Sequence, residues 1–268
     1  MAAAREVAFG DGTVHFFVPK AAGAARDPFV LVLHGLGGSG SELEQALGLT
    51  AFASARRFLF AAPDGTLDAQ GRRFWNANDV CCNFGRIDVD DVGRLTALID
   101  YAVQKLNADP ERVFVIGYSN GGFMAHRLAC ERADRVRAIV SIAAAGPGAA
   151  QRCEPKRAVS VLEIHGSEDP IVPFDGGHLF GRDELPRTPS VATGLAVWAR
   201  AARCQSELRP SGRLDLLVEV PGVDTESLDY SDCGDASPVL WKVGGAGHVI
   251  PLGAAALDAI WQFLPGRR

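Results

Sequence analysis

Long hydrophobic runs are absent from this sequence. No apolar stretch reaches the roughly 18 residues that a membrane-spanning helix needs. The best candidate, between Ala138 and Ala150, is short and is interrupted by serine, glycine and proline. The first residues, Met1 to Glu6, have no apolar core segment and do not resemble a signal peptide. The sequence therefore predicts no membrane partner.

A strong excess of charge of one sign is also missing. The chain has 27 basic and 32 acidic residues, which gives a net charge of −5, and the basic residues are scattered along its length. Nucleic-acid-binding domains concentrate basic residues on one face or along one helix. The sequence therefore predicts no nucleic-acid partner.

The cysteines do not form a Cys-x-x-Cys pair, which argues against a zinc ribbon or a thioredoxin-type site. There are six of them, at positions 81, 82, 130, 153, 204 and 233. An even count fits three disulfides and an oxidising compartment, and it also fits six free, buried thiols. Internal repeats and low-complexity tracts are absent as well.

What the chain does have is length and apolar content. With 268 residues and 47% hydrophobic content it can bury a large core, and one α/β domain over residues 1–268 accounts for it. Apolar runs and helical periodicity predict the elements. The predicted strands are Thr13–Val18, Phe29–Leu33, Phe58–Ala62, Val113–Ile116, Val136–Ile142, Val159–Ile164, Leu214–Val220 and Pro238–Val243. The predicted helices are Ser41–Leu49, Asp88–Leu106, Phe123–Ala129, Val191–Ala202 and Ala254–Phe263.

This alternation of strands and helices predicts a mostly parallel central sheet with helices on both faces. In such sheets, ligands bind and chemistry occurs at the carboxyl ends of the strands. The turns that follow the predicted strands are therefore the places to look for functional residues.

The most informative of these turns is the run from Gly117 to Gly122, which contains the pattern Gly-x-Ser-x-Gly around Ser119. It lies between a predicted strand and a predicted helix, which is the context of a nucleophile elbow. Glycines two positions either side of the serine leave room where a Cβ would clash with neighbouring elements. We therefore expect Ser119 to be a catalytic nucleophile. The structural alternative is a glycine-rich turn in which the serine caps the helix.

A second glycine-rich turn, from His34 to Gly40, follows the strand Phe29–Leu33. It can direct backbone N–H groups at a developing oxyanion, and we predict the N–H groups of Leu36 and Asn120 for this role. His34 itself is expected to be structural. A phosphate-binding loop is disfavoured because no Gly-Lys-Ser/Thr follows.

Two more turns supply an acid and a base. Asp169 follows the strand Val159–Ile164 and can orient an imidazole; Glu168 is the alternative acid, and a turn or capping aspartate is the structural alternative. His248 lies in a glycine-rich loop after the strand Pro238–Val243 and is the expected base. The order Ser119, Asp169, His248 is that of the α/β-hydrolases. The remaining histidines fit less well.

Taken together, these motifs resemble the secreted esterases of the feruloyl esterase and polyhydroxybutyrate depolymerase-like group. The resemblance covers most of the chain. It rests on Leu33-His34-Gly35, Pro63-Asp64-Gly65, Trp75-Asn76 followed by Cys81-Cys82, Asp90-Asp91-Val92-Gly93, the run Gly117 to Gly122, His165-Gly166 through Asp169 to Pro173, and Gly247-His248. Where the family has Trp-Pro-Gly after the histidine, this chain has Ile250-Pro251-Leu252, so the aromatic residue is missing.

The resemblance implies an α/β-hydrolase fold, no metal, no cofactor and hydrolysis of ester bonds in a small or polymeric substrate. Feruloyl and other aryl esters are expected first, with short-chain polyhydroxyalkanoate or another polyester, or acetyl xylan, as alternatives. A peptidase and a non-enzymatic hydrolase-fold binding protein are the other classes to separate. The resemblance also implies a secreted or periplasmic location, which requires that a signal peptide has been removed.

The cysteines fit the same comparison. We expect Cys204 to pair with Cys233. Cys81 and Cys82 are expected to bond to Cys130 and Cys153, because a bridge between adjacent cysteines strains the peptide. The segment around them would bring Trp75 to the site, either as a ring that contacts substrate or as ordinary core packing. Tyr118 and Ile250 are the other predicted substrate contacts.

Overall fold

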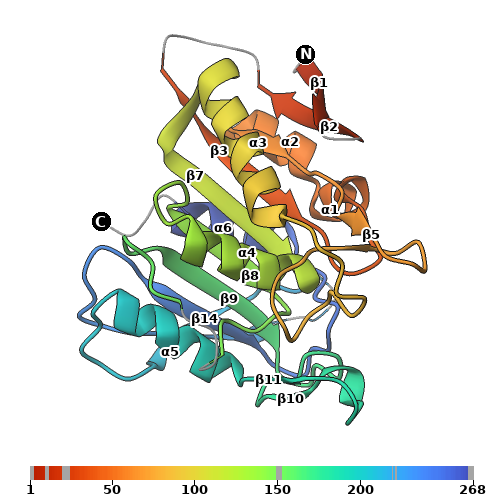
Figure 1. Ribbon diagram of the computed structural model, residues 1–268. Helices are drawn as coiled ribbons and strands as arrows, with labels where there is room; N and C mark the ends of the chain where they lie inside the picture. The colour runs from red at the N-terminus through yellow and green to blue at the C-terminus, as the bar shows by residue number, and fades with distance from the viewer. Residues whose placement is uncertain are drawn as a thin grey trace.

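A ten-stranded sheet forms the centre of the protein (Figure 1). The computed structural model describes residues 3–9, 12–19, 25–148, 153–218, 220 and 222–264. The six central strands are parallel, whereas the two strands at one edge and the two at the other are antiparallel to their neighbours. In spatial order the strands are β1 (Ala3–Phe9), β2 (Gly12–Val18), β4 (Leu59–Ala61), β3 (Asp27–Leu33), β7 (Ala108–Tyr118), β8 (Ala138–Ile142), β9 (Ser160–Gly166), β14 (Pro238–Val243), β13 (Thr225–Asp229) and β12 (Arg209–Leu214).

Helices cover both faces of this sheet (Figure 1). One apolar core lies under α3 (Asp91–Lys105), α4 (Asn120–Glu131) and α5 (Val191–Ala201), and the other lies under α1 (Gly40–Leu47), α2 (Leu49–Arg56) and α6 (Ala254–Phe263). The central strands contribute alternate side chains to the two cores, as Val30 and Val32 do on one face and Phe29, Leu31 and Leu33 on the other. This explains why the Phe29–Leu33 part of β3 is a continuous apolar run in the sequence and why β8 is apolar except for Ser141.

Short elements complete the fold. Two small hairpins, β5 (Thr66–Leu67) with β6 (Arg73–Phe74) and β10 (Gly177–His178) with β11 (Arg187–Thr188), lie outside the main sheet. A single 3₁₀ turn, η1 (Leu179–Gly181), follows β10. These segments occupy loops that come after β4 and β9, so they lie near the carboxyl ends of the parallel strands.

Helix boundaries follow from local capping. Asp90 caps α3 by accepting a hydrogen bond from the Gly93 N–H at 2.8 Å. The predicted helix Ser41–Leu49 ends earlier, because Gly48 adopts a left-handed conformation with φ of 60° and separates α1 from α2. A helix pattern interrupted by one glycine is thus two helices here.

The predicted strand Leu214–Val220 is wrong in its position. The strand is Arg209–Leu214, and it forms a hairpin with β13, which the sequence pattern did not predict. The carboxylate of Asp224 accepts hydrogen bonds from the backbone N–H groups of Leu216 and Leu217, at 3.1 Å and 2.8 Å. These donors are satisfied by a side chain, so the chain leaves the sheet at this point.

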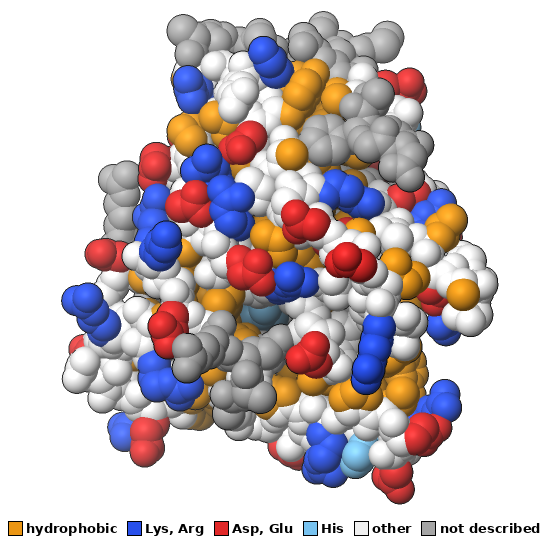
Figure 2. Space-filling view, viewed as in Figure 1, with side chains coloured by type: hydrophobic (Ala, Val, Ile, Leu, Met, Phe, Trp, Pro, Cys, Tyr) orange, Lys and Arg blue, Asp and Glu red, His pale blue; other side chains and the backbone are white. Residues whose placement is uncertain are grey.

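The surface carries both signs of charge. Basic and acidic side chains are interspersed on the face of the molecule that Figure 2 shows, so no field of a single sign covers that face. Among the described residues, no helix has both the length and the apolar content needed to cross a bilayer.

Candidate active site

Ser119 lies in a strained turn between β7 and α4. Its backbone has φ of 52° and ψ of −117°, which is rare for a residue with a side chain. The two flanking glycines make this turn possible. A Cβ on Gly117 would lie 2.1 Å from the carbonyl oxygen of Gly121, and a Cβ on Gly121 would lie 2.0 Å from that of Leu33. The sequence therefore forms the turn predicted from Gly-x-Ser-x-Gly.

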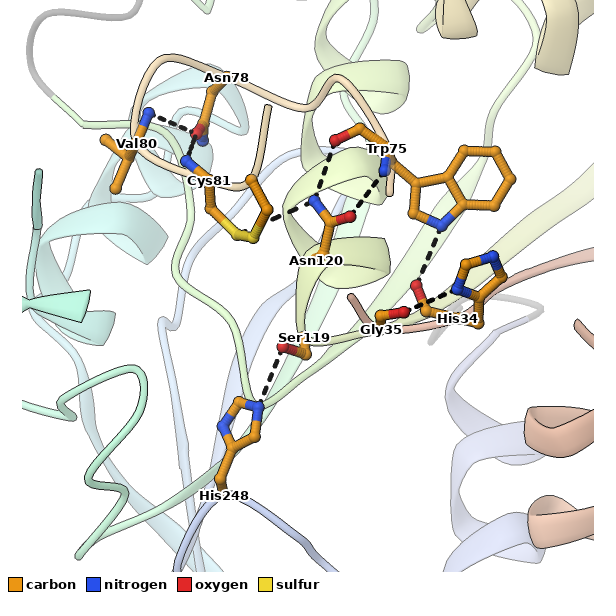
Figure 3. Close-up of a disulfide and its surroundings, with 10 residues drawn as sticks. His34, Gly35, Trp75, Asn78, Val80, Cys81, Ser119, Asn120 and His248 are labelled. Carbon is orange, nitrogen blue, oxygen red and sulfur yellow. Dashed lines mark hydrogen bonds between the residues drawn. A yellow bond between two sulfur atoms is a disulfide. The ribbon is translucent and has the colours of Figure 1, made fainter. Parts of the chain in front are cut away.

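Three loops bring Ser119, Asp169 and His248 together. The loops follow β7, β9 and β14, three strands of the parallel part of the sheet. The Oγ of Ser119 lies 3.0 Å from Nε2 of His248, and Nδ1 of His248 lies 2.7 Å from Oδ2 of Asp169. Figure 3 shows the His248 ring pointing at Ser119. The three side chains thus form one continuous hydrogen-bonded path.

The loops that carry Asp169 and His248 are also joined to each other. The Glu168 N–H donates to the carbonyl oxygen of Ala246 at 3.0 Å. A Cβ on Gly166 would lie 2.3 Å from that same oxygen, so the close approach needs glycine there. The hydroxyl of Tyr118 donates to the backbone oxygen of His248 at 3.1 Å. These contacts fix where the imidazole lies.

Asp169 is ionised in this environment. Burial alone would raise the pKa of its carboxyl group, but hydrogen bonds with His165 and His248 and from the Val172 N–H hold the pKa well below its usual range. Burial, together with the charge of Asp169, raises the pKa of Tyr118 to about 12. Tyr118 therefore stays a neutral hydrogen-bond donor.

The predicted oxyanion turn lies next to Ser119. Leu36, Ser119 and His248 line the same cavity. Within the described part of the chain, the Leu36 N–H donates to no other group, while the next residue, Gly37, donates to the carbonyl oxygen of Arg73 at 2.8 Å and anchors the turn. Asn120 is the first residue of α4, so its N–H has no partner inside the helix. Both N–H groups are free to bind a ligand oxygen.

His34 has a structural role, as expected. Its Nδ1 donates to the carbonyl oxygen of Gly35 at 2.7 Å, and its Nε2 accepts from the Gly65 N–H at 2.9 Å. Burial lowers its pKa, so the ring is neutral and ties the loop after β3 to the loop after β4.

Trp75 does not contact the cavity, and the interpretation as a substrate-binding ring is wrong. The side chain is fully buried and its Nε1–H donates to the carbonyl oxygen of His34 at 3.0 Å. Its backbone N–H donates to Oδ1 of Asn120 at 2.7 Å, and Nδ2 of Asn120 donates back to its carbonyl oxygen at 3.0 Å. Figure 3 shows the Asn120 amide between this segment and the nucleophile turn. The amide thus anchors the Trp75–Cys82 loop, a role that sequence reasoning missed.

Beside Ser119 lies a cavity of about 230 Å³. Its walls are mostly apolar, and they include the predicted contact Tyr118; the other apolar lining residues are Leu36, Cys81, Cys82, Ile171, Val172, Leu179 and Phe180. The predicted contact Ile250 is instead buried in the core on the α6 side of the sheet, because the chain turns inward after His248. Val249 remains exposed next to His248.

The disulfides correct one expectation. The bridges are Cys81–Cys82, Cys130–Cys153 and Cys204–Cys233. The last is the predicted pair, but the expected bonds from Cys81 and Cys82 to Cys130 and Cys153 are wrong. Cys81 Sγ lies 3.8 Å from Nδ2 of Asn120, at the start of α4, whereas Cys130 lies ten residues further along that helix. Ten helical residues span about 15 Å, which is beyond the reach of a disulfide.

Comparison with known proteins places these features in a family. Residues 15–182 match the family model described as phospholipase/carboxylesterase. This chain belongs to that family. The central parallel sheet, the covering helices and the turn at Ser119 are those of the α/β-hydrolase fold. An acetyl xylan esterase from Aspergillus awamori has the same fold, with a TM-score of 0.69 at 15% identity over 98% of this chain and 99% of that one.

Two curated relatives are similar over most of the chain. NocK of Nocardia uniformis subsp. tsuyamanensis, which is named as an esterase, is 32% identical over 84% of this chain and 66% of its own length. Feruloyl esterase B of Piromyces equi is 27% identical over 88% of this chain and 42% of its own length. The chain thus spans about two fifths to two thirds of the length of these two relatives.

Proposed function

We propose that this chain is a carboxylic ester hydrolase with Ser119 as nucleophile, His248 as general base and Asp169 as the acid that orients the base. One observation carries the proposal: the path from Ser119 Oγ through both ring nitrogens of His248 to Asp169, with separations of 3.0 Å and 2.7 Å. Family membership and the esterase names of the relatives support it.

The geometry suits acyl transfer. Nδ1–H of His248 donates to the Asp169 carboxylate, which leaves Nε2 as the acceptor for the Ser119 proton. The Ser119 oxygen attacks the ester carbonyl carbon while its proton passes to Nε2. The resulting tetrahedral intermediate collapses, and the alcohol leaves with that proton. Water then attacks the acyl-enzyme, giving its proton to Nε2, and the acid leaves as Ser119 regains a proton.

The N–H groups of Leu36 and Asn120 bind the negatively charged oxygen of the tetrahedral intermediate. Both come from turns that are fixed before substrate arrives, one by the Gly37–Arg73 hydrogen bond and the other by the start of α4. Donors fixed in this way stabilise developing charge without reorganisation, and losing one such donor typically costs about 10² to 10³ in turnover.

The acyl group is an aryl or feruloyl-type group that enters the apolar cavity beside Ser119. The cavity volume of about 230 Å³ and its apolar walls suit a neutral planar group. Phe180, which is partly exposed, offers a ring face at the wall of the cavity. Burying an aromatic ring against such a wall gives aryl esters an advantage over acetyl esters.

A substrate panel tests this assignment. Methyl ferulate, acetylated xylan and a polyhydroxyalkanoate film are offered to the wild-type chain and to Ser119→Ala, with p-nitrophenyl acetate as a general ester. We expect the highest kcat/KM on methyl ferulate and no turnover above background by Ser119→Ala. Preference for the xylan or the polymer would agree with esterase activity but would overturn the proposed aryl specificity. Failure to hydrolyse any ester would favour a hydrolase-fold binding protein.

Phe180→Ala refines the panel. If this ring packs against an aryl group, the variant loses kcat/KM on methyl ferulate more than on p-nitrophenyl acetate. Phe84→Ala, which removes another partly exposed ring outside the cavity lining, is the matched control and leaves the ratio unchanged. Equal losses on both esters in Phe180→Ala would remove Phe180 from the acyl site.

The protein folds in an oxidising compartment, as secreted and periplasmic proteins do. All six cysteines are in disulfides, and such bridges persist where thiols are not kept reduced. Fractionation of cells that express the gene, with detection of the protein and of its free thiols, tests the location. Recovery from a reducing compartment with free thiols would contradict it.

A further inference from the structure

A buried polar cluster lies behind Asp169, on the side away from Ser119. Its centre is His165 in β9, whose side chain is inaccessible to solvent. Nε2 of His165 lies 3.3 Å from Oδ2 of Asp169, the oxygen that also bonds His248. Asp169 is therefore held between two imidazole rings, only one of which takes part in the proposed chemistry.

Both nitrogens of His165 face acceptors. Nδ1 lies 2.9 Å from the carbonyl oxygen of Ala144, and Nε2 lies 2.8 Å from that of Val172. A neutral imidazole has one N–H and one lone pair, so one of its nitrogens would place a lone pair against a carbonyl oxygen. An imidazolium donates from both nitrogens and satisfies both contacts.

A second buried carboxylate balances this charge. Oε1 of Glu163 lies 3.8 Å from Nδ1 of His165, and Glu163 is itself buried. Its other oxygen, Oε2, is 2.9 Å from Nε2 of His126, and Oε1 accepts from the Ser141 hydroxyl at 3.1 Å. Nδ1 of His126 accepts from Nε1 of Trp198 at 3.0 Å, so Nε2 carries the proton that points at Glu163. Glu163 thus accepts hydrogen bonds from His126 and Ser141 and faces Nδ1 of His165.

We infer that His165 is a positioning residue that is charged at neutral pH, an imidazolium held by Glu163, which keeps Asp169 ionised and fixes the carboxylate that orients His248. The inference rests on the proposed role of Asp169. An isolated buried carboxylate would tend to take a proton, and protonated Asp169 could not accept the Nδ1–H of His248 in the same way. The positive charge beside Oδ2 prevents this.

The assignment sets the net charge of the buried cluster. With Glu163 and Asp169 negative, His165 positive and His248 neutral, the buried cluster carries one negative charge at rest. It becomes neutral when His248 takes the Ser119 proton. The pKa of His165 agrees: burial lowers it, but hydrogen bonds with Asp169, Glu163 and the Val172 carbonyl, together with the charge of Glu163, raise it to about 9. When His248 takes the Ser119 proton, the new positive charge is therefore balanced by the negative charge that the cluster already carries.

Other charged and titratable groups face this cluster from the neighbouring elements. Tyr118 at the end of β7 and His248 in the loop after β14 approach Asp169, and His126 approaches Glu163 from α4. Lys242 of β14 is beside His165 in register, but its ammonium group lies over the ring of Phe174, 5.2 Å from its centre. The same Phe174 ring also contacts the His165 ring, with 5.8 Å between the two ring centres and 72° between the ring planes.

Histidine ¹⁵N NMR of the wild-type protein tests the protonation state without relying on activity. The six histidine rings are assigned from sequential backbone resonances and from His165→Gln, in which one ring signal disappears. We expect His165 to show two protonated nitrogens at pH 7.5. A neutral His165 ring at that pH would overturn the inference, whether or not the protein hydrolyses esters. Absence of ester hydrolysis with a charged His165 would instead count against the proposed function alone.

The pH dependence of kcat/KM tests the effect on the base. His165→Gln removes a positive charge near His248, so protonated His248 becomes more favourable and the acid limb should move to higher pH by about one unit or more. Glu163→Gln removes a negative charge, so the limb should stay or move to lower pH, and His165 should lose its NMR-detected proton at a lower pH than in the wild type. The acid limb of kcat/KM should therefore move to higher pH in His165→Gln and should not do so in Glu163→Gln. A general loss of packing would not produce this difference between the two variants.

Ser141→Ala is the matched control. It removes a hydrogen bond that an uncharged hydroxyl donates to Glu163 from an equally buried position, and it changes no formal charge. Whatever it does to turnover, it should leave the acid limb in place. Acid limbs that coincide in the wild type, His165→Gln and Glu163→Gln would overturn the inference and reduce His165 to a core residue.

Discussion

Each carboxylate oxygen of Asp169 faces two hydrogen-bond donors. Oδ1 accepts from the N–H groups of Ile171 and Val172, at 2.8 Å and 2.9 Å, and Oδ2 faces His248 and His165. A side chain with this many partners has one orientation. The orientation of the His248 ring is therefore set in part by the loop after β9, which carries Asp169.

Asp169→Asn should lower kcat by about 10⁴, because an amide can donate to Nδ1 and favour the tautomer that cannot accept the Ser119 proton. Glu168→Gln is the matched control: Glu168 is the neighbouring carboxylate, but it is exposed, and its loss should leave kcat within about twofold. Steady-state kinetics of both variants, with folding checked by circular dichroism, measure the difference. Equal activity in the two variants would remove Asp169 from the site.

Residues of the site differ in how well the sequence identifies them. Ser119, Asp169 and His248 each follow a predicted strand within a recognisable turn, so their meeting could be foreseen from the strand-end rule. Trp75 and Ile250 could not be placed, because the direction of a side chain in a loop depends on tertiary contacts. For Trp75 these contacts come from Asn120, 45 residues away.

Among the elements, the junction of β7 and α4 has the least room. The chain reverses there with the Gly117 and Gly121 backbones in contact with neighbouring carbonyl groups. Strain of this kind persists only when the surrounding elements hold the turn in place. Here the Ser119 N–H donates to the carbonyl oxygen of Ile142 at 2.8 Å, which ties the turn to β8.

Gly121→Ala should destabilise the protein by about 2 kcal/mol or more, because the new methyl group would overlap the Leu33 carbonyl and force α4 away from β3. Gly212→Ala is the control, since a Cβ at that position meets no atom within 4 Å. Urea denaturation measures both. A Gly121→Ala protein as stable as Gly212→Ala would show that the turn is not tightly packed.

Interior elements were predicted more accurately than peripheral ones. The strands β3, β8 and β9 are buried on both faces, and most of their residues are apolar; Ser141, Glu163 and His165 are buried polar exceptions. In contrast, β13 has the sequence Thr-Glu-Ser-Leu-Asp and is held as a strand by its ladders to β12 and β14. Such a segment has little strand preference of its own, and only tertiary pairing determines its conformation.

Removing the Cys204–Cys233 bridge should lower stability. The bridge joins the segment just after α5 to the segment just after β13, across 29 residues. Closing a loop of this length restricts the unfolded chain by about 3.6 kcal/mol on the chain-entropy estimate, which is the upper limit of the expected loss. Calorimetry of the Cys204→Ser/Cys233→Ser double variant measures it. An unchanged melting temperature would mean that the Cys204–Cys233 bridge does not contribute to the stability of the fold.

Over the whole molecule, the proposed site combines loops from three strands, and its charges are buried together beneath them. Asp169, Glu163 and His165 are buried, while the face that Figure 2 shows mixes both signs of charge. Buried groups are screened much less by salt than exposed ones. The dependence of stability on pH near neutrality should therefore reflect this cluster more than the surface.

Stability should fall as the pH rises from about 6.5 to 9. Folded His165 has a pKa raised to about 9, whereas unfolded histidine titrates near 6.5. Its contribution to the free energy of unfolding is therefore complete below pH 6.5 and is lost as the pH passes through about 9. Urea denaturation at several pH values should show a steeper decline for the wild type than for His165→Gln. Parallel declines would mean that His165 does not titrate on unfolding.

The most direct test of the proposed activity is covalent labelling of the nucleophile. Diethyl p-nitrophenyl phosphate phosphorylates an activated serine and releases p-nitrophenolate. We expect one equivalent of p-nitrophenolate per chain, a diethylphosphoryl group on the peptide that contains Ser119, and neither product with Ser119→Ala. A label on another residue, or the same reaction in Ser119→Ala, would contradict the assignment of Ser119 as the nucleophile of an ester hydrolase.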